Sequence, residues 1–393
     1  MGAVITAIAR TPIGRFGGAF KPLQAVDLGA AAIGGVLDRS GLEPSAVDEV
    51  LFGHVIQAGA GQITARQAAV RAGIPMSVPA TTINKVCLSG LTAIAEADRH
   101  VRLGESTFVV AGGMESMTNA PYVLPTGRYG AFMGDTTLVD AMTHDGLWCA
   151  FDHCTMGESS DRKNLTLGIE REEQDAWSAE SHRRAAEASA SGHFADEIVP
   201  VTVPRRRGDP VEVDADEGIR PDSSTESLGG LRPAFADDGT ITAGNASQIS
   251  DGGAAVLVAD RSAAEARGLP ILAEIVSYGQ VGGADPTLHE RPAEALRIAL
   301  KRASMAPSDL DLVEINEAFA AVALWSARML DLPHDRVNVH GGAVALGHPL
   351  GATGARIVVT LVNALRARGG GVGAATLCGG GGQGDALVLE VAG

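Results

Sequence analysis

The sequence predicts an α/β fold made of two related halves, and three features of the chain support this. Short apolar runs alternate with stretches of helical periodicity along most of the 393 residues, an order typical of sheets covered by helices. One segment of the first half recurs near the C-terminus. Between the two copies the chain becomes more polar, which indicates an inserted region.

The individual elements follow from the spacing of apolar residues. Buried strands are expected in apolar runs that end at glycines or polar residues, at the N-terminus (MGAVITAIA) and at 50–56, 106–113, 254–260, 311–316, 373–378 and 386–391. Helices are expected where the apolar residues follow the helical period, at 27–40, 90–103, 170–190, 292–304, 317–330 and 353–368.

The repeat supports a duplicated domain. Residues 37–50 read LDRSGLEPSAVDEV, and residues 300–313 read LKRASMAPSDLDLV. Each copy is expected to hold a helix end, a Pro-Ser turn and a strand. In each half a further helix then leads to a strand that ends in Gly-Gly. Two such halves would pack about an approximate two-fold axis, so that their matching loops would meet on one side.

Residues 119–243 differ from both halves. They contain Pro, Gly, a polar helix at 170–190 and the run Arg205-Arg206-Arg207, which we expect to be a solvated loop. An insertion above paired loops is the usual place for a ligand cover. The predicted domains are therefore an N-terminal half (1–118 and 244–269), an inserted loop domain over the ligand site (119–243) and a C-terminal half (270–393).

Composition excludes several classes of protein. The formal net charge of −16 argues against a binder of nucleic acid or of anionic membranes, which needs a basic face. The chain has no apolar run long enough for a membrane span and no secretory signal. Four scattered cysteines are too few for a disulfide framework. We therefore expect a cytoplasmic protein with no nucleic-acid or membrane partner.

Cys87 lies in the segment NKVCLSG. Gly90 and the spacing of Leu91, Ile94 and Val101 predict a helix that starts just after it. The positive end of a helix and its free N–H groups favour a thiolate, which is the reactive form of cysteine. Taken alone, however, a cysteine at such a place is more often a small buried residue.

Three further segments hold groups that could take part in chemistry. Cys378 lies in TLCGGGGQG, where a strand runs into four glycines. His348 lies in GGAVALGHPLGATG, on a loop, because Pro349 prevents a helix from running through it. Asn316 and Glu317 follow the strand DLVEI, where α/β folds place functional groups. A tight turn, a surface histidine and an ordinary strand end are the structural alternatives.

Together these segments closely resemble the thiolase family. NKVCLSG, NEAFA, GGAVALGHPLGATG and CGGGGQG occur in this order, and ARTPIG and TAGNASQISDGGAA are also similar to segments of that family. The resemblance covers essentially the whole chain, and biosynthetic acetyl-CoA acetyltransferases are the members it resembles most. It implies a five-layered αβαβα core of two duplicated α/β halves, a loop domain over the active site, and a homodimer or homotetramer.

The resemblance also implies a reaction and its catalytic residues. The reaction is the reversible Claisen condensation of two acetyl-CoA to acetoacetyl-CoA and CoA, with CoA thioesters as substrates and no cofactor. Cys87 would be acetylated after His348 takes its proton, and Cys378 would move the α-proton of the second acetyl-CoA. Oxyanions would be stabilised by His348 with a water held by Asn316, and by the N–H groups of Cys87 and Gly380.

Coenzyme A is expected under the loop domain. The residues at matching family positions are Arg220 beside the adenine, Ser247 on the pantetheine arm, Phe235, Ala318 and Phe319 along the tunnel, and Met156 in the loop domain. Ser247 also fits a turn in the segment GNAS.

Two places depart from the family pattern. Thr155 stands directly before Met156, where many acetyl-CoA acetyltransferases have His. In the segment LHERP, where many members have Met and then Gly, Leu288 and Arg291 could reshape the acyl pocket. The preferred chain length therefore stays open.

No metal is expected. Cys149 and Cys154 enclose His153, but two cysteines and one histidine fall short of a usual zinc site, and no second Cys/His pair follows.

Three other functions stay open. A degradative 3-ketoacyl-CoA thiolase would use the same residues on longer or ring-derived chains. A decarboxylating ketoacyl synthase would share the fold, but the second thiol of Cys378 argues against it. An acyl-CoA-binding protein without activity is disfavoured because Cys87, Asn316, His348 and Cys378 occur together.

Overall fold

The computed structural model describes residues 2–130 and 132–393 and contains one large mixed sheet. Its strands are β1 (Ala3–Arg10), β2 (Gly14–Arg15), β3 (Glu49–Gly53), β4 (Ala80–Ile83), β5 (Phe108–Ser116), β12 (Ser250–Asp260), β13 (Ala273–Gly282), β14 (Leu312–Ile315), β15 (Gly371–Gly379) and β16 (Gln383–Val391). The order is β14-β15-β16-β13-β1-β12-β5-β3-β4, and β2 pairs with β12.

The sheet consists of two portions that meet at β1 and β13. These two strands pair at only two positions, Val4 with Glu274 and Ile5 with Ala273. By contrast, β5 and β12 pair along nearly their whole length, and so do β15 and β16. The narrow junction lets the two portions turn away from each other and enclose a layer of helices.

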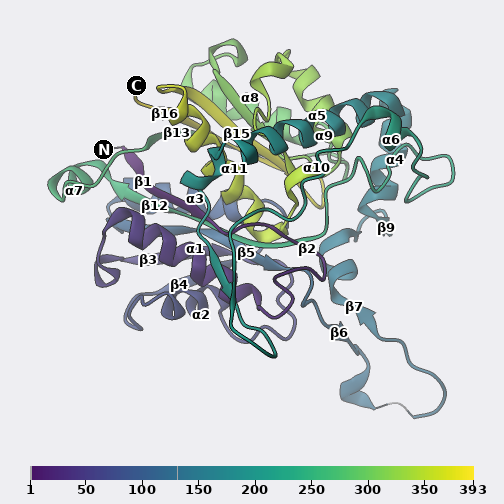
Figure 1. Cartoon of the computed structure of the whole chain (residues 1–393), viewed down its shortest axis with the longest axis horizontal. Coiled ribbons are helices and arrows are strands. Elements are labelled where there is room, and N and C mark those ends of the chain that lie inside the picture. The colour runs from purple at the N-terminus through teal and green to yellow at the C-terminus, as the bar shows by residue number, and fades with distance from the viewer. Residues whose placement is uncertain (1, 131) are drawn as a thin grey trace.

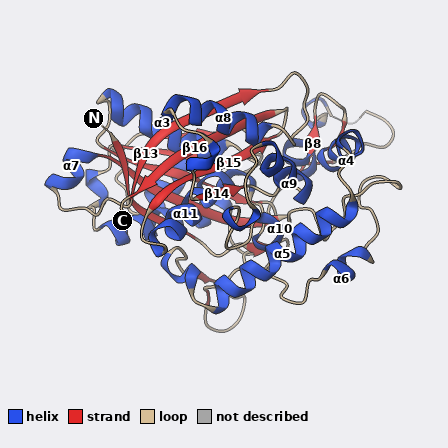
Figure 2. Cartoon of the chain, turned by 90° about the horizontal axis from the view of Figure 1, so that it is seen from above, coloured by secondary structure: helices blue, strands red, loops and turns tan. Residues whose placement is uncertain are grey.

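Helices complete a five-layered αβαβα arrangement (Figures 1 and 2). Helices α1 (Ala25–Ser40) and α2 (Thr64–Arg71) cover the outer face of the N-terminal portion, whereas α8 (Arg291–Ala303) and α9 (Ala320–Met329) lie outside the C-terminal portion. Helices α3 (Ser89–Leu103) and α11 (Leu350–Ala367) pack between the two portions. The short α7 (Arg261–Ala266) leaves β12 on the way to the second half.

The predicted repeat is present in the structure. In the first copy α1 ends at Ser40, a 3-10 turn covers Pro44–Ala46, and β3 follows. In the second copy α8 ends at Ala303, a 3-10 turn covers Pro307–Asp309, and β14 follows. The two strands lie near opposite ends of the large sheet.

The segment predicted as the loop domain has its own small elements. They are α4 (Met156–Leu167), α5 (Arg171–Ala190), α6 (Thr225–Gly229), and the hairpins of β6 (Tyr122–Val123) with β7 (Val139–Asp140), β8 (Trp148–Cys149) with β9 (Cys154–Thr155), and β10 (Val201–Val203) with β11 (Val211–Val213). Within residues 2–130 and 132–393, none of these strands pairs with the large sheet. Figure 1 shows the β6–β7 hairpin extending from the body of the molecule. The exact domain limits remain a prediction.

The two central helices cross at glycines, and this crossing positions the site. A Cβ added to Gly90 of α3 would lie 2.8 Å from the backbone nitrogen of Ala355, and one added to Gly354 of α11 would lie 2.3 Å from that of Leu91. Both distances are too short for any side chain, so only glycine permits this approach. Because α3 begins after Cys87 and α11 begins after His348, the crossing brings these two residues together.

Two predicted helix boundaries shift for structural reasons. The predicted helix 317–330 starts at Ala320, because Phe319 is extended and pairs with Ala246. The predicted helix 353–368 starts at Leu350, since its glycines serve close helix packing and do not interrupt the helix. In the described residues, no helix combines the length and apolar character that a membrane crossing requires.

Candidate active site

Cys87 sits in a tight turn at the start of α3. Val86 has φ 51°, a left-handed conformation that β-branched residues rarely adopt. The turn is held by Ser89, whose Oγ accepts from Lys85 N at 2.8 Å and donates to Val86 O at 2.6 Å. A strained residue kept in place by its neighbours is typical of functional sites. Cys87 is thereby fixed in a buried position with its sulfur in the cavity described below.

His348 lies on the predicted loop, between the short helix α10 (Ala343–Leu346) and α11. Gly347 before it has φ 113°, and a Cβ there would lie 2.3 Å from Ser250 Oγ. The position therefore requires glycine. The backbone N–H of His348 points to Gln248 O and Ser250 Oγ, both at 3.2 Å. The loop is thus fixed against the segment that leads into β12.

The two residues form a hydrogen-bonded pair, with Cys87 Sγ 3.3 Å from His348 Nε2. The other ring nitrogen, Nδ1, lies 2.7 Å from Thr353 Oγ1, and the Thr353 hydroxyl donates to Pro349 O at 2.8 Å. A hydroxyl has one hydrogen, so Thr353 accepts from Nδ1–H. The lone pair of His348 Nε2 therefore faces the thiol of Cys87, which is the arrangement of a general base.

Burial decides the resting charges of this pair. It raises the pKa of the Cys87 thiol to about 12, although the N–H groups of Gly380 and of Cys87 itself oppose this shift. Burial, together with the charge of Arg356, lowers the pKa of His348 to about 3. Both groups are therefore neutral near pH 7. The N–H groups at the helix start favour the thiolate, as expected, but desolvation of the buried sulfur outweighs them.

Cys378 is the second-last residue of the strand β15 (Gly371–Gly379) and is fully buried. It belongs to an apolar cluster with Ile241, Leu288, Phe319 and Val322. Burial, and after it the charge of Cys87, raises the pKa of the Cys378 thiol. The influence of Cys87 reflects how close the two sulfur atoms are, and both line the same cavity.

The glycines after Cys378 have distinct roles. A Cβ at Gly380 would lie 3.4 Å from Val86, an ordinary contact, so steric exclusion does not explain glycine at this position. Gly381 and Gly382 have φ 78° and 70°, and a Cβ at Gly382 would lie 2.0 Å from Asp285 O. The turn thus depends on the later two glycines, and it aims the N–H of Gly380 at Cys87.

A cavity of about 570 Å³ connects these groups to the surface. It is lined by four of the predicted catalytic residues, Cys87, His348, Cys378 and Gly380, and by all six predicted CoA residues, Met156, Arg220, Phe235, Ser247, Ala318 and Phe319. Phe235 and Phe319 meet edge to face with ring centroids 6.1 Å apart. The chemistry-bearing residues therefore converge at one end of an apolar tunnel.

Asn316 is not among the lining residues, but it lies two residues before Ala318, which lines the cavity. It is fully buried, and neither its Oδ1 nor its Nδ2 has a hydrogen-bond partner within the described residues. A buried amide without partners costs about 1–3 kcal/mol per group. Its amide is therefore suited to hold a water or a substrate oxygen.

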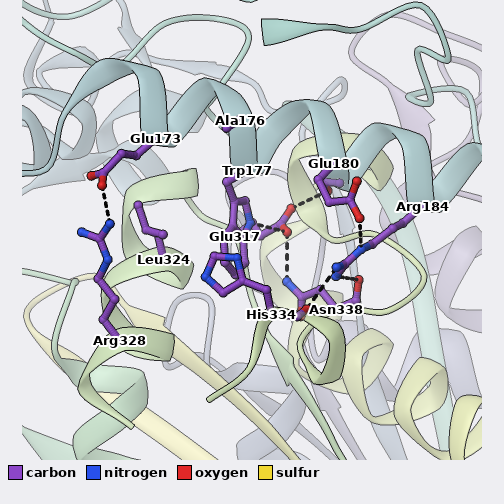
Figure 3. A pocket seen from close by; sticks show the side chains of 11 residues that line it. Glu173, Ala176, Trp177, Glu180, Arg184, Glu317, Leu324, Arg328, His334 and Asn338 are labelled. Carbon is purple, nitrogen blue, oxygen red and sulfur yellow. Dashed lines mark hydrogen bonds and ion pairs between the residues drawn. The ribbon is translucent and has the colours of Figure 1, made fainter. Parts of the chain in front are cut away.

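Glu317, next to Asn316, ties three segments together (Figure 3). Its Oε1 accepts from Trp177 Nε1 at 2.8 Å and Asn338 Nδ2 at 2.9 Å. Its Oε2 accepts from Ser181 Oγ at 2.8 Å and from the backbone N–H of Val344 at 3.0 Å. One carboxylate thus joins the end of β14 to α5 and to α10, which leads into the loop of His348.

Two family models together match nearly the whole chain. The model for the N-terminal domain of thiolase matches residues 3–262, and that for the C-terminal domain of thiolase matches residues 269–391. The chain belongs to the thiolase family.

Individual thiolases are similar over their full length. The chain is 52% identical to a "Probable acetyl-CoA acetyltransferase" of Mycolicibacterium smegmatis over 98% of this chain and 100% of that protein. It is 48% identical to an acetyl-CoA acetyltransferase of Pseudomonas aeruginosa, with 98% of each chain covered. A crystal structure of the Bacillus anthracis acetyl-CoA acetyltransferase superposes with a TM-score of 0.97 at 43% identity, covering 99% of this chain and 98% of that chain.

The two departures from the thiolase pattern have different consequences. Thr155 lines the cavity, and its Oγ1 caps α4 by accepting from Glu158 N at 3.2 Å. Leu288 also lines the cavity. Arg291 does not; it is buried in ion pairs with Asp285, Glu290 and Glu294. The expectation that Arg291 could reshape the acyl pocket is therefore wrong, because its charge is held by α8 and the preceding loop.

Cys149 and Cys154 are opposite each other in the β8–β9 hairpin, and His153 lies in its turn with φ 52°. In the described part of the chain, no three His, Cys, Asp or Glu side chains gather in a metal-binding group. The hairpin instead forms a wall of the site, where Thr155 reaches the thiolase cavity and Phe151 lies beside Gly381.

Several residues of this thiolase site were not predicted from the sequence. Thr353 orients His348 through helix geometry that a loop-like, glycine-rich segment conceals. Glu115 accepts from the N–H groups of Val55, Ile56 and Gly351, so it anchors the start of α11. The segment GGMES that contains Glu115 gave only a strand signal. Arg15 lies at the cavity mouth, directly after the segment ARTPIG that the family resemblance had marked.

Proposed function

We propose that this protein is an acetyl-CoA C-acetyltransferase. It condenses two acetyl-CoA reversibly to acetoacetyl-CoA and CoA through an acetyl-Cys87 intermediate. The pair of Cys87 Sγ and His348 Nε2, 3.3 Å apart at the end of an apolar tunnel, carries this proposal. The names of the similar proteins, acetyl-CoA acetyltransferases of several bacteria, support it.

The resting protonation state suits the cleavage direction of the reaction. Cys87 gives its proton to His348 Nε2 while its sulfur attacks the 3-keto carbon of acetoacetyl-CoA. The N–H groups of Cys87 and Gly380 point at this sulfur, where they can stabilise charge that develops next to it. When the bond between C2 and C3 breaks, the acetyl-CoA enolate takes the proton of Cys378. Acetyl-CoA leaves, and Cys87 stays acetylated.

The second half-reaction restores both thiols. An incoming CoA thiol gives its proton to the Cys378 thiolate and attacks the carbonyl of acetyl-Cys87. Cys87 leaves as a thiolate and takes the proton back from His348. A water on Asn316, together with His348, would stabilise a thioester enolate oxygen, which accounts for the unpartnered amide of Asn316. Condensation follows the same steps in reverse order.

The surroundings of Cys378 support a short acyl group. Ile241, Leu288, Phe319 and Val322 pack around it as buried apolar side chains, with Met156 beside them. A long 3-ketoacyl chain would have to displace these close-packed groups. This supports the acetyl-specific reaction over degradative cleavage of longer chains.

Mass spectrometry of the acetylated protein tests the proposal. Incubation with acetyl-CoA should add one acetyl group to the peptide that contains Cys87 in the wild type, and none in Cys87→Ala. Cys378→Ala should still be acetylated but should lose condensation. Normal acetylation of Cys87→Ala, or full condensation by Cys378→Ala, would refute the assigned roles.

We further propose that CoA thioesters are the only small molecules required. Acyl transfer and proton transfer are redox-neutral, and two thiols and an imidazole supply the acid–base groups. Activity should survive dialysis against a chelator. A loss that is restored by one added metal ion would contradict this.

We also propose that the protein is a homo-oligomer in the cytoplasm. The outer edge of β14 is covered by Asn338, which bonds Val313 O and both backbone groups of Ile315. The edge strand β4 pairs only with β3 in the described residues, and open edges invite pairing with a second copy. All four cysteines are free, and Cys87 and Cys378 can act only when reduced, which supports a reducing compartment.

Sedimentation of the wild type and of Thr81→Lys tests the oligomer. Thr81 is exposed on β4, and a lysine on an edge strand opposes pairing between copies. The variant should dissociate. Exposed Phe132 and Met133, which are 96% and 92% accessible on the β6–β7 hairpin, offer a second contact, so Phe132→Ser distinguishes dimer from tetramer. A monomeric wild type would refute the proposal.

A further inference from the structure

Arg15 is a cation at the mouth of the catalytic cavity, and the reaction proposed above gives it no role. It lies at the end of β2, is exposed, and lines the cavity together with Arg220. Within the described residues, neither guanidinium has a hydrogen-bond or ion-pair partner. In a chain with a formal net charge of −16, these two guanidinium groups make the cavity mouth locally positive, which favours a negatively charged ligand.

The backbone around Arg15 is firmly positioned. Glu217 Oε2 accepts from Arg15 N at 2.9 Å, and both carboxylate oxygens of Glu217 accept from Ala19 N. Phe16 N donates to Ile249 O at 3.1 Å. Within the described residues, Glu217 forms these backbone contacts and no ion pair with the guanidinium of Arg15.

The same contacts place Arg15 near Arg220. Glu217 precedes Arg220 by three residues, so its bonds join the segment of one arginine to the segment of the other. The buried ion pair between Arg10 and Asp216 strengthens this connection, and Asp216 Oδ1 also accepts from Ile13 N at 2.8 Å. Two guanidinium groups are thus presented at one opening by two segments that are bonded together.

The chemistry of the substrate fits this arrangement. The tunnel beyond the mouth is apolar and ends at Cys87, which suits the pantetheine arm. The diphosphate and the 3′-phosphate at the other end of coenzyme A carry strongly solvated charges that cannot enter such a tunnel. Arginine binds phosphate oxygens through two parallel N–H groups.

We propose that Arg15, together with Arg220, binds the phosphate groups of the nucleotide end of coenzyme A and thereby selects CoA thioesters over phosphate-free thioesters. This inference rests on the proposed function. Arg15 is a substrate-binding residue here and takes no part in proton or acyl transfer.

Steady-state thiolysis with a panel of thioesters tests it. The substrates are acetoacetyl-CoA, acetoacetyl-dephospho-CoA, which lacks the 3′-phosphate, and acetoacetyl-pantetheine, which has no phosphate. Arg15→Ala should raise KM for acetoacetyl-CoA about 2- to 5-fold, the upper range for an exposed ion pair. KM for acetoacetyl-pantetheine should change less than about twofold, since that substrate has no charge to bind. The dephospho substrate shows which phosphate is bound.

Matched controls separate this effect from a change in net charge. Arg207→Ala removes another exposed arginine, from the β10–β11 loop outside the cavity, and should not change the KM ratio. Arg15→Lys should keep part of the selectivity, and the wild-type preference should weaken as salt rises.

The outcomes for Arg15 and for the proposed reaction are distinct. If Arg15→Ala raises both KM values equally, or neither, the phosphate contact is wrong while the thiolase reaction stands. If the wild type turns over no acetoacetyl thioester and Cys87 is not acetylated, the proposed function itself fails.

Discussion

Thr353 holds His348 in one tautomer, because its Oγ1 lies 2.7 Å from Nδ1 while its hydroxyl donates to Pro349 O at 2.8 Å. The imidazole therefore presents an unprotonated Nε2 to Cys87. Thr353 lies in the first turn of α11, and Pro349 directly precedes this helix. Base orientation is thus a property of the helix start.

Removing the Thr353 hydroxyl should slow acylation. Thr353→Val keeps the shape but leaves Nδ1–H without an acceptor, which frees the ring to turn and to change tautomer. Acetylation of Cys87 in a single turnover should slow about 10- to 100-fold, a part of what a positioned base contributes. Thr353→Ser should retain most of the rate. Equal rates for the valine variant and the wild type would show that the ring is oriented by something else.

The resting thiol should be neutral across the physiological range. Since burial raises the pKa of Cys87 to about 12 and lowers that of His348 to about 3, the free enzyme should hold no thiolate–imidazolium pair. The thiolate absorbance of the wild type minus that of Cys87→Ala should stay near zero from about pH 5 to 9 and rise only above that range. A plateau of thiolate near pH 7 would contradict this assignment.

Glu317→Gln should damage both stability and catalysis. The carboxylate accepts hydrogen bonds from Trp177, Ser181, Asn338 and Val344, and an amide would turn two hydrogens toward these donors. Unfolding should become easier by about 2–4 kcal/mol, measured in urea, and kcat should fall as the His348 loop loosens. Glu187→Gln on the exposed face of α5 is the control and should change stability by less than about 0.5 kcal/mol.

Leu288→Ala should widen the acyl pocket. Leu288 is 4% exposed and packs in the apolar cluster around Cys378, so truncation leaves space beside the reacting carbon. Thiolysis of 3-ketohexanoyl-CoA relative to acetoacetyl-CoA should rise about tenfold, as expected for one or two accommodated methylenes. An unchanged ratio would place the limit on chain length at another residue.

Acid should destabilise the protein through buried histidines. Burial lowers the pKa of His289 and of His348 to about 3 each. In the unfolded chain these groups take up protons near pH 6.5, whereas the folded protein excludes those protons. The contribution of these two histidines to stability is therefore complete above about pH 6.5 and is lost as pH falls toward 3, at about 1.4 kcal/mol per pH unit for each histidine.

His289→Gln isolates one of these two contributions. His289 Nε2 lies 2.7 Å from Asn164 Oδ1, and glutamine can keep this hydrogen bond without titrating. Urea unfolding at pH 4, 5 and 6 should show a shallower loss of stability in the variant, by about 1.4 kcal/mol per pH unit. Parallel curves for variant and wild type would mean that His289 is protonated in the folded state.

The sequence predicted the layout of the fold, and the family resemblance named residues that the structure brings to one cavity, but neither predicted the balance of forces within the site. The repeat around the two Pro-Ser turns and the helix after Cys87 are local patterns, and the structure confirms them. Whether Cys87 rests as a thiolate depends on the competition between a helix end and burial, and burial is a tertiary property. The roles of Thr353 and Glu317 could not be predicted for the same reason, because each depends on contacts that form only in the folded chain.

Glycine-rich segments were the hardest to interpret. Gly351 was predicted to belong to the loop before α11, yet it lies inside the helix. A Cβ on Gly351 would lie 2.6 Å from Met114 O, so the missing side chain serves packing between layers. Sequence alone does not distinguish a glycine that bends the chain from one that lets two backbones touch.

The crossing of α3 and α11 at Gly90 and Gly354 sets the distance between Cys87 Sγ and His348 Nε2. Because main-chain atoms are in direct contact at this crossing, the two helices cannot approach further, and the separation of the sulfur and the imidazole is fixed from below. Even one extra methyl group at the crossing would push the two helices apart and so separate the nucleophile from the base, while the rest of the fold could stay as it is.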